Sequence, residues 1–586
     1  EISLAPGISV VGESLTMSAG YLGTLAGVSG SSWSGDIALN GNVAFYTQSP
    51  LTISGAISSS GVYGFTKTSS GELTLSGINS YTGSTIISAG TLKVGSATAL
   101  GASTAAVSIT NGAVLDLNGQ TMTNTNPLTI NGTGISSGGA VINSSSTAAT
   151  YAGLLTLGRA SSIVGGTGTI AISNVGTITG AGFGLTLGGA QGGSIASVIG
   201  TTTGALTKAD AGTWTLTGLN TYTGITTISA GVLSVSKLAN GGVASGIGQS
   251  SNVAANLVIN GGTLKFVGTT AQSTDRLFTI GANGGTLDAS GTGTLTWSGN
   301  GTGSANAIAR TNSTSPTLTL SGTGIASMAS IWANALTSGT SALTKTGTGT
   351  WKISASNTYT GATNINNGTL QLGNASAFSS STAITINTNG ALDLNGLTVS
   401  RSITLNGGAL TNSNTTTTAI IGNAITITLT ADSTLMAATG ATLQLGSGGS
   451  AAPISGAFAI RIGNSSNRGD VKFQNSSCTY TGGTTIDYGR LLLRTYFAAP
   501  STNFVGPGAV TVNANGTFDN FDYSVPNAIT LNGGILSASS PNSNGAFTGV
   551  ITLTADSTIA GYTMQLGTSS SSVLLQISGG IVGNFG

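Results

Sequence analysis

Histidine is absent from this 586-residue chain, and cysteine occurs once, as Cys478. Proline supplies 9 residues, and aromatic side chains make up 5% of the total. The lack of histidine excludes histidine-ligated metal sites and His-based catalytic triads. One cysteine cannot build a framework of intramolecular disulfides. The sequence therefore predicts no catalytic, metal or cofactor site, and we expect a protein that is not an enzyme.

Charge is also scarce. The chain has 16 Lys+Arg and 15 Asp+Glu, which is 5% of its residues, whereas soluble domains average about 25%. A net charge of +1 offers no basic face for a nucleic-acid partner. The 39% of hydrophobic residues argues against a disordered chain. No apolar run approaches the ~18 residues of a membrane helix, so we expect no transmembrane segment.

Glycine is abundant in place of charged residues, and much of the remaining sequence alternates between apolar and hydroxyl-bearing residues. Glycine accounts for 93 residues, and runs such as Ile425-Thr-Ile-Thr-Leu-Thr430 place apolar side chains on one face only. Turns such as Asn260-Gly-Gly262 separate these runs. Period-2 alternation between glycine-rich turns is typical of short β-strands. The sequence predicts an all-β protein.

A repeat becomes visible when the chain is aligned on four tyrosines. Each tyrosine is followed by Thr at one and four residues, Gly at two and nine, Ile at six and Leu at eleven. A lysine lies fourteen residues before the first three tyrosines but only eight before the fourth, which suggests that a short strand is missing there. The aligned structural positions are Lys67, Tyr81, Gly83, Ile87, Gly90 and Leu92; Lys208, Tyr222, Gly224, Ile228, Gly231 and Leu233; Lys345, Tyr359, Gly361, Ile365, Gly368 and Leu370; and Lys472, Tyr480, Gly482, Ile486, Gly489 and Leu491.

Small repeated modules bury a continuous core only when they stack. The sequence therefore predicts one elongated parallel β-helix, or β-solenoid, of roughly 25 rungs. Equal charges stacked one strand spacing apart would repel, which explains their scarcity. The predicted organisation is an N-terminal segment with the first rungs and a possible strand-exchange region (1–62), then repeat units 63–203, 204–340, 341–468 and 469–586, the last with a degraded start and an open end.

Two strings point to a known family. Leu343-Thr-Lys-Thr-Gly-Thr-Gly-Thr-Trp351 is followed by Asn357-Thr-Tyr-Thr-Gly361, and similar strings surround Tyr81 and Tyr222. They resemble the autotransporter-associated β-strand repeat, also called the passenger-associated transport repeat. The resemblance implies a right-handed β-helical passenger exported to the bacterial surface or matrix, where many family members are adhesins or matrix components.

Several side chains are candidates for chemistry. Cys478 replaces the asparagine of the other three copies, and we expect a small buried side chain there, with an intermolecular disulfide or a nucleophile as weaker alternatives. The repeated lysines are expected on solvated turns, or else as a polysaccharide-binding stripe along one side of the coil. Trp214 and Trp351 are expected to pack in the core rather than to stack on sugars.

Acidic residues are further candidates, because some β-helical enzymes use carboxylates for catalysis. Asp519 and Asp522 would point to opposite faces of a strand, and two carboxylates are too few for Ca²⁺. Asp432 and Asp556 recur in Thr-Ala-Asp-Ser-Thr and are expected to cap turns.

The chain begins at Glu1 without methionine, as a mature exported product would, and both ends look uncapped. The leading hypothesis is therefore an extracellular structural protein whose solenoid subunits assemble head-to-tail, with itself as partner, into surface or matrix fibres. The alternative is a cleaved or truncated autotransporter passenger that acts as a monomeric adhesin rod and binds a glycan or a host surface.

Overall fold

Regular structure in this protein is almost entirely strand. The computed structural model describes residues 2–24, 29–299, 301, 306–311, 315–334, 339–378, 380–422, 425–447, 453–474, 478–494, 504–521, 524–539, 546–561, 576–577 and 579–583. In these ranges helix is limited to two 3-10 turns, η1 (Ile135–Ser137) and η2 (Ala254–Asn256). Strands of successive turns pair in parallel, and over the described residues the coil makes about 23 turns. The predicted all-β parallel solenoid is confirmed, and the number of turns is close to the expected 25.

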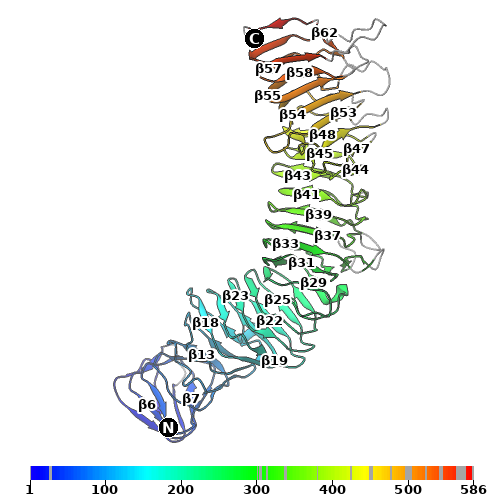
Figure 1. Ribbon diagram of the computed structural model, residues 1–586. Helices are drawn as coiled ribbons and strands as arrows, with labels where there is room; N and C mark the ends of the chain where they lie inside the picture. Colours follow the sequence, from blue (N-terminus) through cyan, green and yellow to red (C-terminus); the bar gives the residue numbers. More distant parts are fainter. Residues whose placement is uncertain are drawn as a thin grey trace. The chain divides into compact units, whose positions relative to one another are not determined.

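The chain divides into two compact units. Unit 1 comprises Glu1–Leu295 and Ala309–Thr311, and unit 2 comprises Thr296–Ile308 and Asn312–Gly586. Within each unit the strands lie one above the next in successive turns (Figure 1). Strands of the same face pair with each other and form three faces, and some turns carry strands on only two of these faces.

In unit 1, each of the first three turns has one strand on each of the three faces. The first face contains β1 (Ile2–Leu4), β4 (Tyr21–Thr24), β7 (Val43–Thr47), β10 (Phe65–Thr68), β12 (Thr85–Ile87), β14 (Val107–Ile109), β16 (Leu128–Gly132) and the start of β19 (Leu155–Val164). The second contains β2 (Ser9–Val10), β5 (Ser31–Trp33), β8 (Leu51–Ile53), β11 (Glu72–Leu75), β13 (Gly90–Val94), β15 (Ala113–Asp116), β17 (Val141–Ile142), the end of β19, β22 (Leu185–Gly188), β25 (Leu206–Lys208), β27 (Thr226–Ile228), β29 (Leu257–Ile259) and β32 (Thr279–Ile280). The third includes β3 (Leu15–Met17), β6 (Ile37–Leu39) and β9 (Ile57–Ser59), and later β18 (Ala149–Tyr151), β20 (Ile170–Ile172), β23 (Gly192–Ile195), β26 (Thr213–Leu216), β28 (Val232–Val235), β30 (Thr263–Phe266) and β33 (Gly285–Ala289).

In unit 2 we call the faces A, B and C. Face A contains β36 (Thr317–Ser321), β38 (Ala342–Lys345), β40 (Thr363–Ile365), β42 (Ile384–Asn387), β45 (Ile403–Asn406), β48 (Ile427–Ala431) and β51 (Ile454–Ser455). Face B contains β37 (Ile325–Met328), β39 (Thr350–Ile353), β41 (Gly368–Leu372), β43 (Gly390–Asp393), β46 (Ala409–Asn412), β49 (Ser433–Ala437), β52 (Ile460–Ile462), the starts of β54 (Thr484–Arg494) and β55 (Val510–Asn520), β57 (Ile529–Asn532) and β60 (Ile551–Ala555). Face C contains β44 (Thr398–Val399), β47 (Ala419–Ile421), β50 (Thr442–Leu445), β53 (Asp470–Gln474), the ends of β54 and β55, β58 (Ile535–Ala538) and β61 (Thr558–Gly561).

The core of each unit consists of apolar columns that run along the coil. Leu73 pairs with Leu92, and Leu92 pairs with Leu115 in the next turn; none of the three is exposed to solvent. The neighbouring positions on these strands are mostly polar, as at Thr74 and Thr91. Alternation along each strand therefore sorts apolar residues inward, as the sequence pattern predicted.

Two glycines of the repeat are required by the backbone. A Cβ on Gly83 would lie 2.2 Å from the backbone carbonyl carbon of Tyr63 in the preceding turn, which no side chain can tolerate. Gly90 has φ +66°, and a Cβ there would lie 2.7 Å from the Lys67 ammonium nitrogen. Both glycines recur in all four copies because adjacent turns approach too closely for any other residue.

Candidate functional site

Each repeated tyrosine forms a buried lock with a threonine at the equivalent corner of its own copy. The Tyr81 hydroxyl lies 2.6 Å from the Thr85 hydroxyl four residues on, and neither side chain is exposed. The same pair recurs as Tyr222 with Thr226, Tyr359 with Thr363 and Tyr480 with Thr484, at 2.7, 2.5 and 2.6 Å. Burial raises the pKa of each tyrosine. These positions of the repeat are thus structural.

The repeated lysines join adjacent turns. The Lys345 ammonium donates hydrogen bonds to the carbonyl oxygens of Thr346 (2.6 Å) and Gly347 (2.8 Å) on its own turn and of Asn367 (3.0 Å) on the next. Lys67 and Lys208 each make the same three bonds at the equivalent corners. Burial lowers the pKa of Lys67, Lys208 and Lys345 to about 8.

This arrangement corrects two expectations. Lys67, Lys208 and Lys345 are fully buried, so they neither solvate a surface turn nor offer a binding stripe to polysaccharide. A lysine side chain reaches inward here because three carbonyl groups at a tight corner need donors, and its ammonium carries three. The backbone geometry of the corner, which the sequence pattern does not display, decides its direction.

The fourth copy has no lysine at this position. Ile462 pairs with Ile486 as Lys345 pairs with Ile365, so Ile462 is the equivalent residue, and it is fully buried. Lys472 lies on the next face, where it pairs with Leu492 and donates to the Gln444 side chain at 3.0 Å. No strand is missing between them: β52 and β53 are both present, and a longer turn separates them. The assignments of Lys472 and of a lost strand were both wrong.

Successive copies of the repeat lie on different faces of their unit. In unit 1 the column that holds Leu73 and Leu92 continues through Leu187 to Lys208, six turns further on. Lys67 belongs instead to the column of Phe45 and Ile87 on the first face. The second copy is therefore displaced by one face from the first.

The same displacement occurs within unit 2. The column of Trp351 and Leu370 on face B leads through Leu435 to Ile462 and Ile486 of the fourth copy. The first strand of the third copy lies on face A, and that of the fourth lies on face B. Within each unit, the interval between its two copies thus holds a whole number of turns plus one further face.

The remaining candidates from the repeat are also internal. Trp214 and Trp351 are fully buried and donate their indole N–H to the carbonyl oxygens of Gly188 (2.9 Å) and Ser321 (2.7 Å), which confirms core packing. Cys478 is buried as expected, and burial raises the pKa of its thiol to about 12. A thiol of this kind is a poor nucleophile at neutral pH.

Asp519 belongs to a buried contact between turns. Its carboxylate accepts hydrogen bonds from the Ser539 backbone N–H (3.2 Å) and hydroxyl (2.7 Å) one turn further on. Asp116 with Ser144 and Asp393 with Ser413 repeat this contact, with hydroxyl distances of 2.6 Å in both. Asp522 lies outside the described residues.

The predicted turn-capping role of Asp432 takes a specific form. Its carboxylate accepts a hydrogen bond from the backbone N–H of Ala459 in the next turn, at 2.8 Å. The Asp432 carboxylate therefore joins two successive turns of the coil and does not cap its own β-turn.

One segment departs from the uncharged pattern and was not singled out from the sequence. Residues 461–494 hold seven of the chain's 31 charged residues, most of them at outward positions of β52, β53 and β54: Arg461, Arg468, Asp470, Lys472, Asp487, Arg490 and Arg494. Local charge density was the signal that could have found it. We call residues 461–494 the charged segment.

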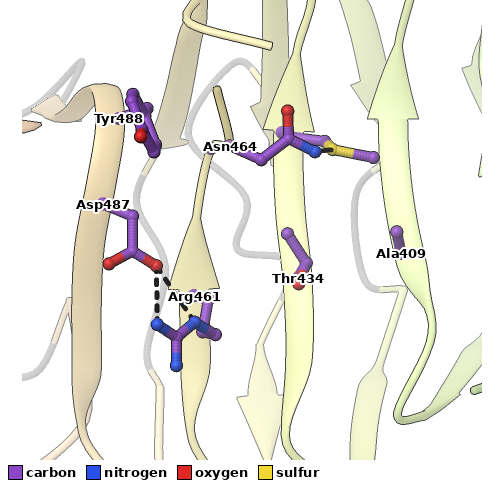
Figure 2. Close-up of a pocket in the computed structure, with 8 residues that line it drawn as sticks. Ala409, Thr434, Arg461, Asn464, Asp487 and Tyr488 are labelled. Atoms are coloured by element: carbon purple, nitrogen blue, oxygen red, sulfur yellow. Dashed lines mark hydrogen bonds and ion pairs between the residues drawn. The ribbon is translucent and has the colours of Figure 1, made fainter. Parts of the chain in front are cut away.

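An open hollow of about 460 Å³ lies on face B within this segment. Figure 2 shows Arg461 of β52 reaching toward Asp487 of β54, with Tyr488 beyond and Asn464, Thr434 and Ala409 around them. The Asp487 carboxylate accepts from the Arg461 Nε at 3.0 Å and pairs with an Nη at 2.9 Å. The Arg461 side chain is 57% exposed, so the pair is accessible to a ligand.

The chemistry of the hollow suits a hydroxyl-rich ligand. A carboxylate offers acceptors, while a guanidinium and an amide offer donors. Arg468 stacks over the Tyr488 ring at 5.0 Å and holds that side chain at the rim. The hollow can therefore contact vicinal hydroxyl groups without a net charge of its own.

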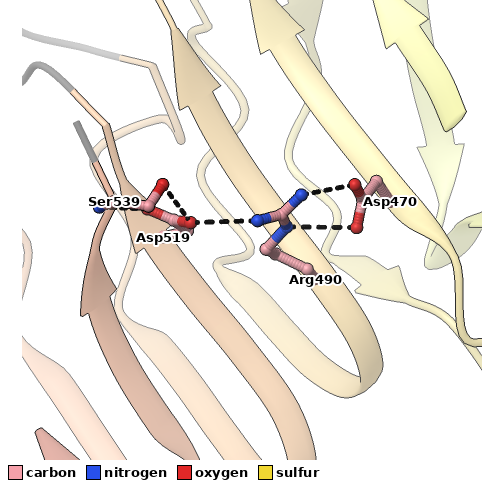
Figure 3. A network of polar contacts seen from close by, with 4 residues as sticks. All are labelled: Asp470, Arg490, Asp519 and Ser539. Atoms are coloured by element: carbon pink, nitrogen blue, oxygen red, sulfur yellow. Dashed lines mark hydrogen bonds and ion pairs between the residues drawn. The ribbon is translucent and has the colours of Figure 1, made fainter. Parts of the chain in front are cut away.

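A second charged group lies on face C. Figure 3 shows Arg490 between Asp470 and Asp519, with Ser539 on the far side of Asp519. Arg490 bonds Asp470 at 2.6 and 3.1 Å and Asp519 at 3.3 Å, and the bond to Asp470 raises the pKa of Arg490. From Asp470 to Ser539, this network joins four successive turns.

Within the described part of the chain, no group of three or more His, Cys, Asp or Glu side chains could hold a metal ion. No helix there is long and apolar enough to cross a membrane.

Comparison with known proteins agrees with the repeat geometry. A family model, the passenger-associated-transport-repeat, matches residues 65–94, 206–235, 343–372 and 475–493. These four segments are passenger-associated transport repeats. The Adhesin BmaC autotransporter of Brucella suis biovar 1 (strain 1330) is 37% identical over 233 residues, which cover 40% of this chain and 6% of that protein. The match thus spans a small part of that relative's length. No solved structure matches this chain.

Proposed function

We propose that this chain is the surface-exposed or secreted passenger of an adhesin-type bacterial protein and that it binds carbohydrate through the hollow around Arg461 and Asp487. The passenger-associated transport repeats and the likeness to an autotransporter adhesin support the surface setting. The role is structural and adhesive, not enzymatic.

The observation that carries the binding site is the accessible ion pair of the hollow. Elsewhere on faces A and B of unit 2 the outward positions are mainly uncharged, although Lys352 is an outward charge on face B, and Lys345 is turned inward. An exposed arginine and a partly exposed aspartate beside a tyrosine supply the donors, acceptors and apolar surface that bind sugars.

Binding of the purified chain to an array of immobilised glycans tests this function. We expect one class of glycan to be retained, and Asp487→Ala to reduce its binding at least ten-fold. Arg159→Ala, which removes an exposed arginine from unit 1, is the matched control and should bind normally. Retention of no glycan, or equal loss in both variants, would contradict the proposal.

Head-to-tail assembly into fibres remains a prediction from the sequence. Electron microscopy of the purified protein tests it, because discrete particles of uniform length would rule it out.

A further inference from the structure

Two ladders of amide side chains run along unit 2, parallel to the axis of the coil. On face A, Asn387 donates to Asn366 at 2.7 Å, Asn406 donates to Asn387 at 2.8 Å, and Thr430 donates to Asn406 at 3.1 Å. We call this the first ladder. Each bond joins one turn to the next.

The second ladder lies on face B and begins at the hollow. Asn513 donates to Asp487 at 2.7 Å, Asn532 donates to Asn513 at 3.1 Å, and Thr554 donates to Asn532 at 3.4 Å. With the Arg461–Asp487 pair, the ladder links five successive turns. The second ladder lies on face B, whereas the first lies on face A. This is the same displacement by one face that separates the fourth copy of the repeat from the third.

A column of threonines accompanies the second ladder. Thr485 pairs with Thr511, Thr511 with Thr530, and Thr530 with Thr552, and all four side chains are partly exposed. Residues two apart on a strand point to the same side. Face B therefore presents two parallel rows, one of hydroxyls and one of amides, beside each other over four turns.

These rows form a fixed array of donors and acceptors. An amide has two N–H donors and a carbonyl oxygen with two lone pairs, and the ladder bonds take one donor and one lone pair. The bonds also hold each amide in one orientation, which lowers the entropy lost when a ligand binds. The array repeats at the strand spacing of ~4.8 Å.

A matching ligand must be extended, uncharged and rich in hydroxyl groups that recur at a similar spacing. The outward side chains of both rows after Asp487 carry no charge, so an anionic polymer would gain nothing from them. An extended polysaccharide has the required repeat of hydroxyl groups, and its end can enter the hollow at Arg461.

We propose that face B is a track for an extended, uncharged, β-linked polysaccharide, which lies along Asp487, Asn513, Asn532 and Thr554 with about one sugar per turn. This inference rests on the proposed function, since it extends the same site. It adds the ligand class and predicts that binding depends on the length of the chain.

Calorimetric titration of the full purified chain with β-1,4-linked gluco-oligosaccharides of two, four and six residues tests the track. We expect at least ten-fold higher affinity for the tetramer than for the dimer, and less than a three-fold further gain for the hexamer. In the double variant Asn513→Ala/Asn532→Ala, the tetramer should bind no more tightly than the dimer.

The matched control is Asn387→Ala/Asn406→Ala, which removes two amides of the first ladder and should not alter binding. Circular dichroism establishes that each variant is folded, and Asn513→Thr/Asn532→Thr replaces the double alanine variant if it is not. Equal affinity at all lengths, with dimer binding still abolished by Asp487→Ala, would overturn the track but leave the proposed function intact. If neither the oligosaccharides nor the glycan array shows binding, both proposals are wrong.

Discussion

The third and fourth copies of the repeat lie in the same unit and differ in where they place charge. The third copy buries Lys345 under three carbonyl groups and has few charged residues on its surface. The fourth has Ile462 at that position and carries seven charges, most of them outward, between Arg461 and Arg494. Both keep the buried pair of tyrosine and threonine.

The comparison shows which positions of the repeat the coil requires and which positions can vary. The tyrosine lock and the closely approached glycines recur in all four copies, because they lie where neighbouring turns touch. The lysine is not required, because the fourth copy has Ile462 in its place and a longer turn after it. The outward residues of the fourth copy also differ from those of the third, and the hollow and the second ladder begin there.

The largest effect is expected at the buried lysine of the third copy. Lys345→Met leaves three carbonyl groups without their donor and should lower the free energy of unfolding by about 3 kcal/mol. Urea unfolding measures the loss of global stability, and hydrogen exchange of the amides of residues 343–372 measures the local loss. Lys352→Met, at a half-exposed position of the same strand pair, should change stability by less than about 0.5 kcal/mol. Similar losses in both variants would contradict the role of Lys345.

Removing the tyrosine hydroxyl should affect the third and fourth copies alike. Tyr359→Phe and Tyr480→Phe each leave a buried threonine hydroxyl without its closest partner, at a cost of about 1–2 kcal/mol. Urea unfolding of both variants makes the comparison. A loss confined to the third copy would show that the fourth no longer depends on the lock.

The network around Arg490 should contribute a smaller amount that depends on salt. Arg490→Gln removes the partner of the buried Asp519 carboxylate and should cost about 1 kcal/mol, because the arginine is itself 38% exposed and partly screened by water. The cost should shrink in high salt. Asp393 serves as the reference carboxylate, because it accepts a hydrogen bond from the uncharged Gln371 side chain and not from an arginine. The stability lost in Gln371→Ala should therefore not depend on salt.

A weak dependence of stability on pH should arise from the buried lysine of the third copy. Folding lowers the pKa of Lys345 from 10.5 to about 8, so above pH 8 the unfolded chain holds more protons and stability rises with pH. The rise should be measured between pH 8 and 9, since above this range ionisation of the tyrosines, whose pKa burial raises, favours unfolding. Lys345→Met should reduce the slope, and Ile462→Val, which changes no ionisable group, should not.

The smallest effect is expected at Cys478. Since burial raises the pKa of this thiol to about 12, iodoacetamide at pH 8 should not modify it in the folded protein within hours, whereas urea should make it reactive. Mass spectrometry of the intact protein follows the reaction. Rapid modification without urea would place Cys478 at the surface.

Much of the fold could be predicted from particular residues. The alternation in Ile425–Thr430 and the repeated Tyr-Thr-Gly strings identified strands, turns and stacking, because each depends on neighbours in sequence. The charged segment could also have been noticed, since its density of charge is a local property. The site within it could not, because Arg461 and Asp487 meet only when β52 and β54 pair.

By itself, the sequence determined an all-β parallel solenoid whose uncharged turns stack, since period-2 alternation and the scarcity of charge allow little else. Only the tertiary structure decided that three lysines point inward, that Ile462 takes the place of the fourth, and that the two copies within each unit are displaced by one face. The physical reason is that these outcomes depend on carbonyl groups, closely approached backbones and register between turns about 20 residues apart, which no local pattern in the chain encodes.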